Sequence, residues 1–200
     1  MAVYNRKDHF YEKAKKEGKA SRAIYKIEEI HKKYRILRKK DLVLDLGCAP
    51  GGWLQFLSET VGPEGKVIGI DRAPIHIPLK SNTVFIQKNI EEGLKEELAP
   101  LLKIKKADVL VSDMAPDTSG IPFRDSYLSY ELIQMVWKVT PFVLKTGGNF
   151  VVKVFPGKEA DELLKIVRKH FDLFKVFIPE STRKTSIEVY WVGLKFRPTI

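Results

Sequence analysis

Cysteine, long apolar runs and internal repeats are scarce or missing in this chain of 200 residues. Its one cysteine, Cys48, excludes an internal disulfide and a metal site built from several cysteines, and it fits a reducing compartment. No apolar run could span a membrane, and the first residues, MAVYNRKDHF, lack the apolar core of a signal peptide. We therefore expect a cytoplasmic, globular protein with no metal and no membrane partner.

No long linker or low-complexity tract divides the chain, and 44% hydrophobic residues suffice for one substantial core. We expect a single domain over residues 1–200 with a basic helical segment over residues 1–40. That segment holds 14 Lys and Arg against 5 Asp and Glu, whereas the rest of the chain is nearly neutral. Such a balance favours a polyanionic partner, most often nucleic acid; the alternative is a solvated lysine-rich surface.

Short apolar runs alternate with amphipathic segments after residue 41, which predicts a βαβ, doubly wound, mostly parallel sheet with helices on both faces. The expected strands are 42–46, 66–70, 83–87, 107–112 and 148–154. The expected helices are 6–17, 21–38 (with Ser21 as N-cap), 51–60, 92–102, 125–144 and 158–170. Runs 172–178 and 186–196 have only a loop between them, which predicts a C-terminal antiparallel hairpin and seven strands in all.

A glycine-containing turn follows the first strand in the sequence LVLDLGCAPGGW, residues 42–53. Gly47, Gly51 and Gly52 give the spacing G-x-x-x-G-G, which is neither the dinucleotide fingerprint nor a P-loop. Ligands of open α/β sheets bind at this end of the strands, although an ordinary βα turn would look similar. The turn is therefore a candidate cofactor site.

Asp71 ends the second expected strand, 20 residues after Gly51, where an acidic side chain can accept hydrogen bonds from ribose hydroxyls. NAD and S-adenosylmethionine share that requirement. Asn89 follows the third strand and is either an adenine contact or a surface loop residue. The glycine spacing, the terminal hairpin and the lack of a hydride-transfer constellation favour S-adenosylmethionine over NAD.

Four charged residues stand out by their positions. Lys153 and Glu188 interrupt apolar strand patterns, where an unpaired charge is costly. Asp113 follows the fourth strand, and Lys26 lies on the basic N-terminal helix. Each has a simpler explanation: Lys26 as a solvated lysine, Asp113 as a cap, and Lys153 with Glu188 as a structural ion pair.

The segments SRAIYKIEEI, DLGCAPGGW, SDMAPDTSG, NFVVKVFPG and SIEVYWVG, taken in order, resemble the FtsJ/RrmJ family of RNA ribose 2′-O-methyltransferases. The resemblance runs from about residue 10 to residue 196 and implies a Rossmann-like methyltransferase fold. It places a catalytic tetrad on Lys26, Asp113, Lys153 and Glu188, with Lys153 as general base. It also implies S-adenosylmethionine contacts at Gly51, Trp53, Asp71, Asn89 and Asp113.

Two positions depart from the family pattern. Many relatives carry aspartate in place of Asn89, but an amide can still form a hydrogen bond with adenine. Many also carry alanine in place of Cys48, and we expect this exchange of one small side chain for another to be neutral. The resemblance implies methylation of a uridine in large-subunit (23S-type) ribosomal RNA, with transfer RNA as the alternative substrate. A non-catalytic RNA-binding module is the alternative from another class, and the complete tetrad disfavours it.

The expected mechanism requires Lys153 to lose a proton. Burial beside a second cation favours that loss, and Lys26 is the candidate cation. We expect Asp113 to orient Lys153 near the methyl donor, and Glu188 to position Lys26 or the ribose. The basic segment is expected to hold the RNA backbone.

Overall fold

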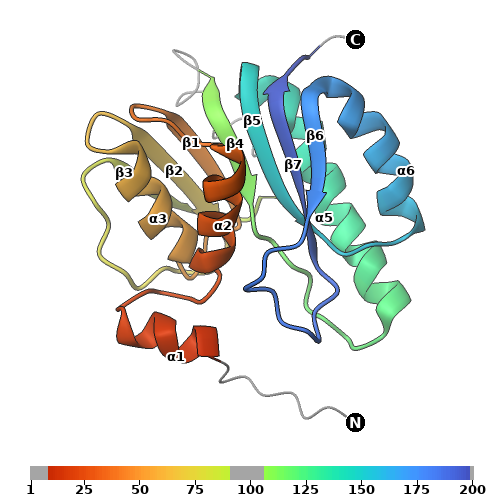
Figure 1. The fold of residues 1–200 in the computed structure, drawn as a ribbon, viewed down its shortest axis with the longest axis horizontal. Helices are drawn as coiled ribbons and strands as arrows, with labels where there is room; N and C mark the ends of the chain where they lie inside the picture. The colour runs from red at the N-terminus through yellow and green to blue at the C-terminus, as the bar shows by residue number, and fades with distance from the viewer. Residues whose placement is uncertain (1–8, 91–105, 199–200) are drawn as a thin grey trace.

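The computed structural model describes residues 9–90 and 106–198, which form a seven-stranded sheet with helices on both faces (Figure 1). The strands are β1 (Leu42–Leu46), β2 (Lys66–Asp71), β3 (Thr83–Gln87), β4 (Ala107–Ser112), β5 (Leu144–Val154), β6 (Phe171–Phe177) and β7 (Val189–Phe196). The helices are α1 (His9–Lys16), α2 (Ile24–Tyr34), α3 (Gly52–Val61), α5 (Pro122–Val143) and α6 (Lys158–Val167), with a 3₁₀ turn at Arg168–His170. The expected helix 92–102 lies outside the described residues.

The strand order is β3-β2-β1-β4-β5-β7-β6, and the order reverses between β1 and β4. Strands β1 to β5 pair in parallel, whereas β7 runs antiparallel to both β5 and β6. This confirms the expected mostly parallel sheet that closes with a C-terminal hairpin. The reversal marks the place where an open α/β sheet binds its ligand.

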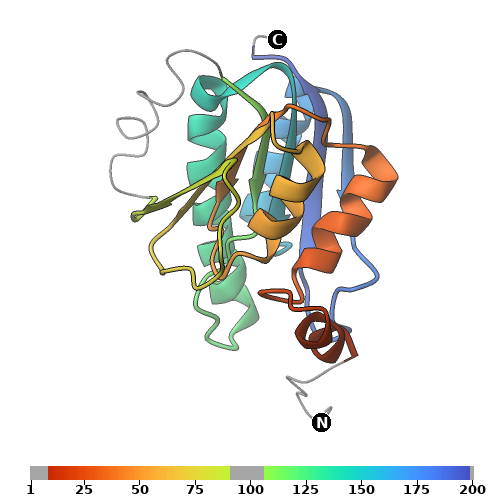
Figure 2. The ribbon, with the colours of Figure 1, turned by 90° about the vertical axis from the view of Figure 1, so that its left-hand side faces the viewer.

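Two apolar clusters lie on opposite faces of the sheet (Figure 2). Helices α2 and α3 cover one face through side chains such as Ile27 and Leu57, which have no exposed surface. Helices α5 and α6 cover the other face through Ile133, Val136 and Val167. Helix α1 packs beside the beginning of α2, where Phe10 lies against Tyr25. The loops that follow the parallel strands lie at the lower edge of Figure 1.

The helix expected over 21–38 is shorter than its sequence pattern, and the expectation that Ser21 caps it is wrong. Helix α2 begins at Ile24 after a helical Ala23, and no side chain caps it. Ser21 instead packs against α3, because a Cβ on Gly52 would lie only 2.4 Å from the Ser21 hydroxyl oxygen. The helix ends early at Arg35, whose φ of 53° turns the chain so that the following apolar side chains become buried.

Four other boundaries differ from expectation by three or more residues, among them the end of α6, which lies at Val167 rather than at residue 170. Helix α5 begins at Pro122 rather than at residue 125, because proline suits the first helical turn. Strand β5 extends back to Leu144, and β7 begins only at Val189. Glu188 therefore lies immediately before the last strand and not inside it.

Candidate active site

The site forms where the carboxyl end of β5 meets the beginning of β7. Because β7 is antiparallel, its first residues lie beside the last residues of β5, and Lys153 pairs in register with Tyr190. Lys153 is 8% exposed and Glu188 is also 8% exposed. The topology thus places two buried charges, which are far apart in the sequence, at the same end of the sheet.

Lys153 makes two contacts with Asp113, the first residue after β4. Its ammonium nitrogen Nζ donates to the Asp113 carbonyl oxygen at 2.5 Å and lies 3.2 Å from the carboxylate oxygen Oδ1. The two side chains are 7% and 17% exposed. Asp113 therefore fixes the position of the Lys153 nitrogen and balances its charge.

Tyr190 is a member of this site that the sequence analysis missed. Its hydroxyl donates to Asp113 Oδ1 at 2.6 Å, and its ring has no exposed surface. Burial and the neighbouring charge of Asp113 raise the pKa of Tyr190 well above its usual value, so the phenol stays neutral. In the strand that the sequence predicts over residues 186–196, Tyr190 lies two residues after Glu188 and on the same side, which is the signal that could have identified it.

Lys26 pairs with Glu188, and their side chains are 11% and 10% exposed. Lys26 is therefore not a solvated surface lysine, and its charge is already balanced by a carboxylate. Lys153 and Glu188 therefore do not form the simple structural ion pair that was the alternative from the sequence. Glu188 pairs with Lys26, and Lys153 pairs with Asp113. Tyr190 lies between the two pairs: its hydroxyl bonds Asp113, and its ring centroid is 5.9 Å from Lys26 Nζ.

Helix α2 and the turn before it hold the loop between β6 and β7 in place. Arg22 lies in that turn, and Lys26 and Glu29 lie on the helix; all three contact this loop or the residue that ends it. The Glu29 carboxylate accepts backbone N–H groups of Glu180 at 2.6 Å and Ser181 at 3.0 Å, and Arg22 donates to the Ser181 carbonyl. Helix α2 thereby positions the loop that leads to Glu188.

The glycine turn after β1 is closed by contacts that leave no room for side chains. Gly51 has φ of 106°, and a Cβ there would lie 2.4 Å from the Ile77 side chain. Gly47 has φ of 76°, and a Cβ there would lie 2.1 Å from Met114. Asp71 connects the turn to β2, since its carboxylate accepts the N–H groups of Ala49 and Ala73, each at 2.8 Å. The turn is thus rigidly built at the switch point.

Trp53 and Asn89 are the other two expected cofactor residues. Trp53 is buried in the first turn of α3, where its indole N–H donates to the carbonyl of Ala23 at 2.9 Å. Its ring centroid is 6.0 Å from that of Tyr190, so it connects the glycine turn with the lysine site. Asn89 is half-buried, two residues after β3. Of these two, Trp53 has the closer structural link to the lysine site.

Three carboxyl groups, those of Asp45, Asp71 and Asp113, lie close enough to influence one another beneath this region. Asp45 is fully buried in β1, and neither of its carboxylate oxygens has a hydrogen-bond partner among the described residues. Burial, and then the charges of Asp113 and Asp71, raise the pKa of Asp45 well above its usual value. Asp45 is therefore held in its uncharged form, and the carboxylates of Asp71 and Asp113 are the charges that suit a cationic ligand such as the sulfonium of S-adenosylmethionine.

Cys48 lies in the glycine turn, between Gly47 and Gly51. Burial raises the pKa of the Cys48 thiol, so it stays protonated and unreactive. Within residues 9–90 and 106–198, no group of three or more His, Cys, Asp or Glu side chains is arranged to hold a metal. The same residues include no helix that is long and apolar enough to cross a membrane.

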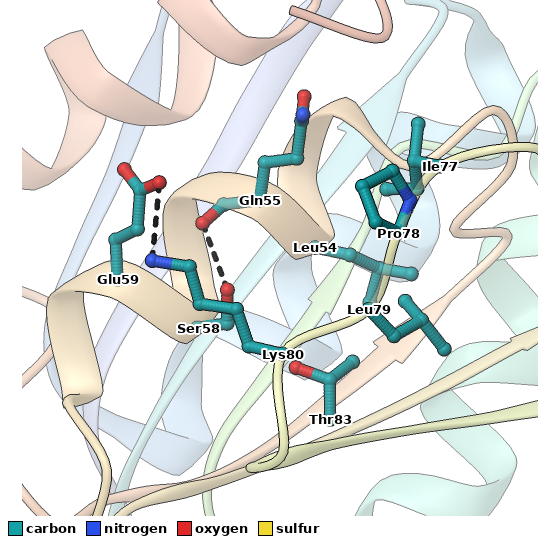
Figure 3. Close-up of a pocket in the computed structure, with 9 residues that line it drawn as sticks. All are labelled: Leu54, Gln55, Ser58, Glu59, Ile77, Pro78, Leu79, Lys80 and Thr83. Carbon is teal, nitrogen blue, oxygen red and sulfur yellow. Dashed lines mark hydrogen bonds and ion pairs between the residues drawn. The ribbon is translucent and has the colours of Figure 1, made fainter.

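A pocket of about 240 Å³ lies on the outer side of α3, under the loop before β3 (Figure 3). It is lined by Leu54, Gln55, Ser58, Glu59, Ile77, Pro78, Leu79, Lys80 and Thr83. None of the expected catalytic or cofactor residues lines it. The pocket is therefore separate from the lysine site.

Comparison with known proteins identifies similar sequences over nearly the whole chain. The family model described as FtsJ-like methyltransferase matches residues 20–196. The ribosomal RNA large subunit methyltransferase E of Desulfatibacillum aliphaticivorans is 45% identical over 187 residues, which cover 94% of this chain and 89% of that protein.

Two solved structures are similar to this chain over most of its length. A protein from Plasmodium falciparum described as a ribosomal RNA methyltransferase has 31% identity and a TM-score of 0.78, covering 88% of this chain and 98% of the other. Fibrillarin from Aeropyrum pernix, solved with natively bound S-adenosyl-L-methionine, has 16% identity and a TM-score of 0.58 over 86% of this chain and 76% of the other. The second likeness concerns the fold alone.

Proposed function

We propose that this chain, which belongs to the FtsJ-like methyltransferase family, transfers a methyl group from S-adenosylmethionine to a ribose 2′-hydroxyl of large-subunit ribosomal RNA. The family and the fold support the methyl transfer. The name of the 45% identical relative supports the choice of RNA. Following the resemblance noted in the sequence, we take the 23S-type RNA and a uridine as the target.

The contact between Lys153 and Asp113 is the observation that carries this proposal. The Lys153 ammonium that pairs with Asp113 must first release one proton, which the carboxylate opposes; the resulting neutral amine has two N–H groups and one lone pair. The carbonyl oxygen and the carboxylate of Asp113 offer an acceptor for each N–H group, at 2.5 and 3.2 Å. The lone pair is then left for a third partner, which we propose is the ribose hydroxyl. Lys153 would take the hydroxyl proton as the oxygen attacks.

S-adenosylmethionine supplies an already activated methyl group on its sulfonium. The chain must therefore align the hydroxyl and remove its proton. Alignment can lower the barrier by roughly 7–11 kcal/mol at best, and a positioned base adds a factor of about 10²–10⁴. We propose that Gly51, Trp53, Asp71, Asn89 and Asp113 hold the cofactor at the switch point.

Lys26 and Glu188 complete the proposed tetrad as a positioning pair. Their mutual contact holds each side chain where the loop after β6 approaches β5. From the sequence we expected Lys26 as a second cation near Lys153, with Glu188 positioning Lys26 or the ribose; in the structure Glu188 contacts Lys26 and offsets its charge. We propose that the pair orients the ribose, while Asp113 and Tyr190 hold the base.

The basic segment over residues 1–40 would supply phosphate contacts. Helix α1 presents exposed Lys13, Lys15 and Lys16 at the lower edge of Figure 1, on the side of the sheet where Lys153 lies. Such contacts give affinity without reading sequence. We propose that the chain works as one catalytic domain in the cytoplasm, with this segment as part of its RNA surface.

Methyl transfer to a panel of substrates tests the proposal. Wild-type protein is incubated with methyl-labelled S-adenosylmethionine and, separately, with free large-subunit ribosomal RNA, assembled large subunits and transfer RNA. We expect label in one or both ribosomal substrates and none in transfer RNA. Label in transfer RNA alone would reject the ribosomal target, and no label in any RNA would favour a binding module. Calorimetry with S-adenosylmethionine and with NAD identifies the cofactor independently.

A further inference from the structure

The beginning of α5 carries an exposed aromatic surface that the proposed chemistry does not use. Phe123 is 74% exposed, which is the largest exposed fraction of any large hydrophobic side chain among the described residues. Tyr127, one helical turn later, is 42% exposed, and its ring centroid lies 6.0 Å from that of Tyr130. Positions 123, 127 and 130 share one helix face, so the three rings form an aromatic strip.

This strip begins at the same end of the sheet as Lys153. The first turns of α5 are fixed against the chain that leaves β5: the N–H of Phe155 donates to the Ser129 hydroxyl at 3.0 Å. A Cβ on Gly157 would lie 3.0 Å from Ser126, so the two backbones approach closely. Figure 1 shows the first turns of α5 at the lower edge, across from α1, with the loop between β6 and β7 between them.

The turn before α5 is held rigidly, so the exposure of Phe123 does not come from a loose loop. The Asp125 carboxylate accepts the N–H and the hydroxyl of Ser119, each at 2.8 Å, and the N–H of Gly120 at 3.1 Å. These bonds, led by that from the Ser119 N–H, lower the pKa of Asp125. A preorganised aromatic side chain loses little conformational entropy when it binds a partner.

Two basic residues lie next to the aromatic strip. Arg124 follows Phe123, and Lys158 follows Gly157; both are exposed and basic. Aromatic rings beside cations are the surface on which unpaired bases stack. The reaction also needs such a surface, because Lys153 is 8% exposed and a ribose can reach it only if its nucleotide leaves the helical stack.

We propose that Phe123, supported by Tyr127, stacks on an unpaired base of the RNA next to the target nucleotide. This inference rests on the proposed function for the position of the target. The RNA would then cross the site from the basic α1 to the aromatic strip of α5. Stacking there replaces part of the stacking energy that the displaced nucleotide loses.

The test compares Phe123→Ala with Phe142→Ala. Phe142 is a matched control, since it lies on the same helix, is 56% exposed and sits at the opposite end of α5. A fluorescein-labelled, uridine-containing single-stranded RNA oligonucleotide serves as the probe. Phe123→Ala should weaken its binding by roughly 5- to 100-fold, with the affinity for S-adenosylmethionine unchanged, whereas Phe142→Ala should bind like wild type. Phe123→Trp should restore binding.

Three outcomes would overturn the inference. The first is an unchanged affinity of Phe123→Ala for the oligonucleotide, and the second is an equal loss of that affinity in Phe142→Ala. The third is weaker binding of Phe123→Ala to assembled subunits while oligonucleotide binding is normal, which would indicate a protein partner. Because binding is measured without methyl transfer, the readout separates the two proposals. A wild-type protein that binds RNA through Phe123 but transfers no methyl group would reject the proposed function alone.

Discussion

Lys153 and Asp45 are both charged residues inside apolar strands, and the structure accommodates them in different ways. Lys153 has two acceptor atoms of Asp113 within 3.2 Å, and Asp113 is further bound by Tyr190. Asp45 has no hydrogen-bond partner among the described residues. The paired residue is the proposed catalytic group, whereas burial favours the protonated, uncharged form of Asp45.

Replacement of Lys153 should separate chemistry from cofactor binding. Lys153→Ala and Lys153→Arg should each lower kcat by at least ~10²-fold, because neither side chain can accept the hydroxyl proton. The affinity for S-adenosylmethionine, measured by calorimetry, should stay within a few-fold of wild type. Lys175→Arg on the exposed side of β6 is the control and should be fully active. Equal loss of activity and cofactor affinity would contradict the role as base.

Asp45→Asn should stabilise the cofactor-free protein at neutral pH. The raised pKa means that the folded state binds a proton more tightly than the unfolded chain, so Asp45 costs stability as pH rises above its unfolded pKa of about 3.9. The variant should unfold at least about 2 °C higher at pH 7, the shift that ~1 kcal/mol gives in a chain of this size. The gain should vanish near pH 4. A lower melting temperature at pH 7 would be inconsistent with this sign.

At the scale of the elements, sequence patterns predicted most of the sheet because buried parallel strands are read directly from apolar runs such as LVLDL and ADVLVS. The hairpin also followed from the lack of a helix between its two runs. The patterns did not predict the boundaries of helices and strands where tertiary contacts determine the backbone conformation. Ser21 packs against Gly52 instead of capping α2, and Glu188 precedes β7. The contact of Tyr190 with Asp113 depends on register, which periodicity alone does not give.

Helix α2 should act on the reaction through the loop that it holds. Glu29→Ala removes the acceptor for two backbone N–H groups of that loop, so Glu188 should lose its fixed position. We expect kcat to fall, by up to ~10²-fold if the ribose is misplaced by about 1 Å, with cofactor affinity nearly unchanged. Glu28→Ala is the neighbouring control on the same helix. Equal activity of the two variants would show that the loop does not need this anchor.

The charge of the molecule as a whole is distributed unevenly. Most of its net charge of +10 lies in residues 1–40, while the remainder is nearly neutral. The sequence predicted this asymmetry but could not place it, because the position of α1 depends on contacts such as Phe10 with Tyr25. In the structure α1 lies at the end of the sheet where the parallel strands finish, and Lys153 lies near that end of β5.

This arrangement predicts a salt effect that belongs to α1. The double substitution Lys15→Gln and Lys16→Gln should weaken RNA binding and reduce the slope of log K against log salt by about 1.4, or ~0.7 for each lost phosphate contact on a single strand. Lys66→Gln with Lys138→Gln changes the net charge equally, at exposed positions away from that edge, and serves as the control. An equal change of slope in both pairs would indicate an effect of net charge only.

The central claim is that Lys153 directs methyl transfer to a ribose hydroxyl. Its most direct test is to methylate large-subunit ribosomal RNA with labelled S-adenosylmethionine, digest the product to nucleosides and identify the labelled one by mass spectrometry. The account predicts a single 2′-O-methylated nucleoside with wild-type protein and no labelled product with Lys153→Arg. Label on a base, or the same 2′-O-methylated product from Lys153→Arg, would contradict it.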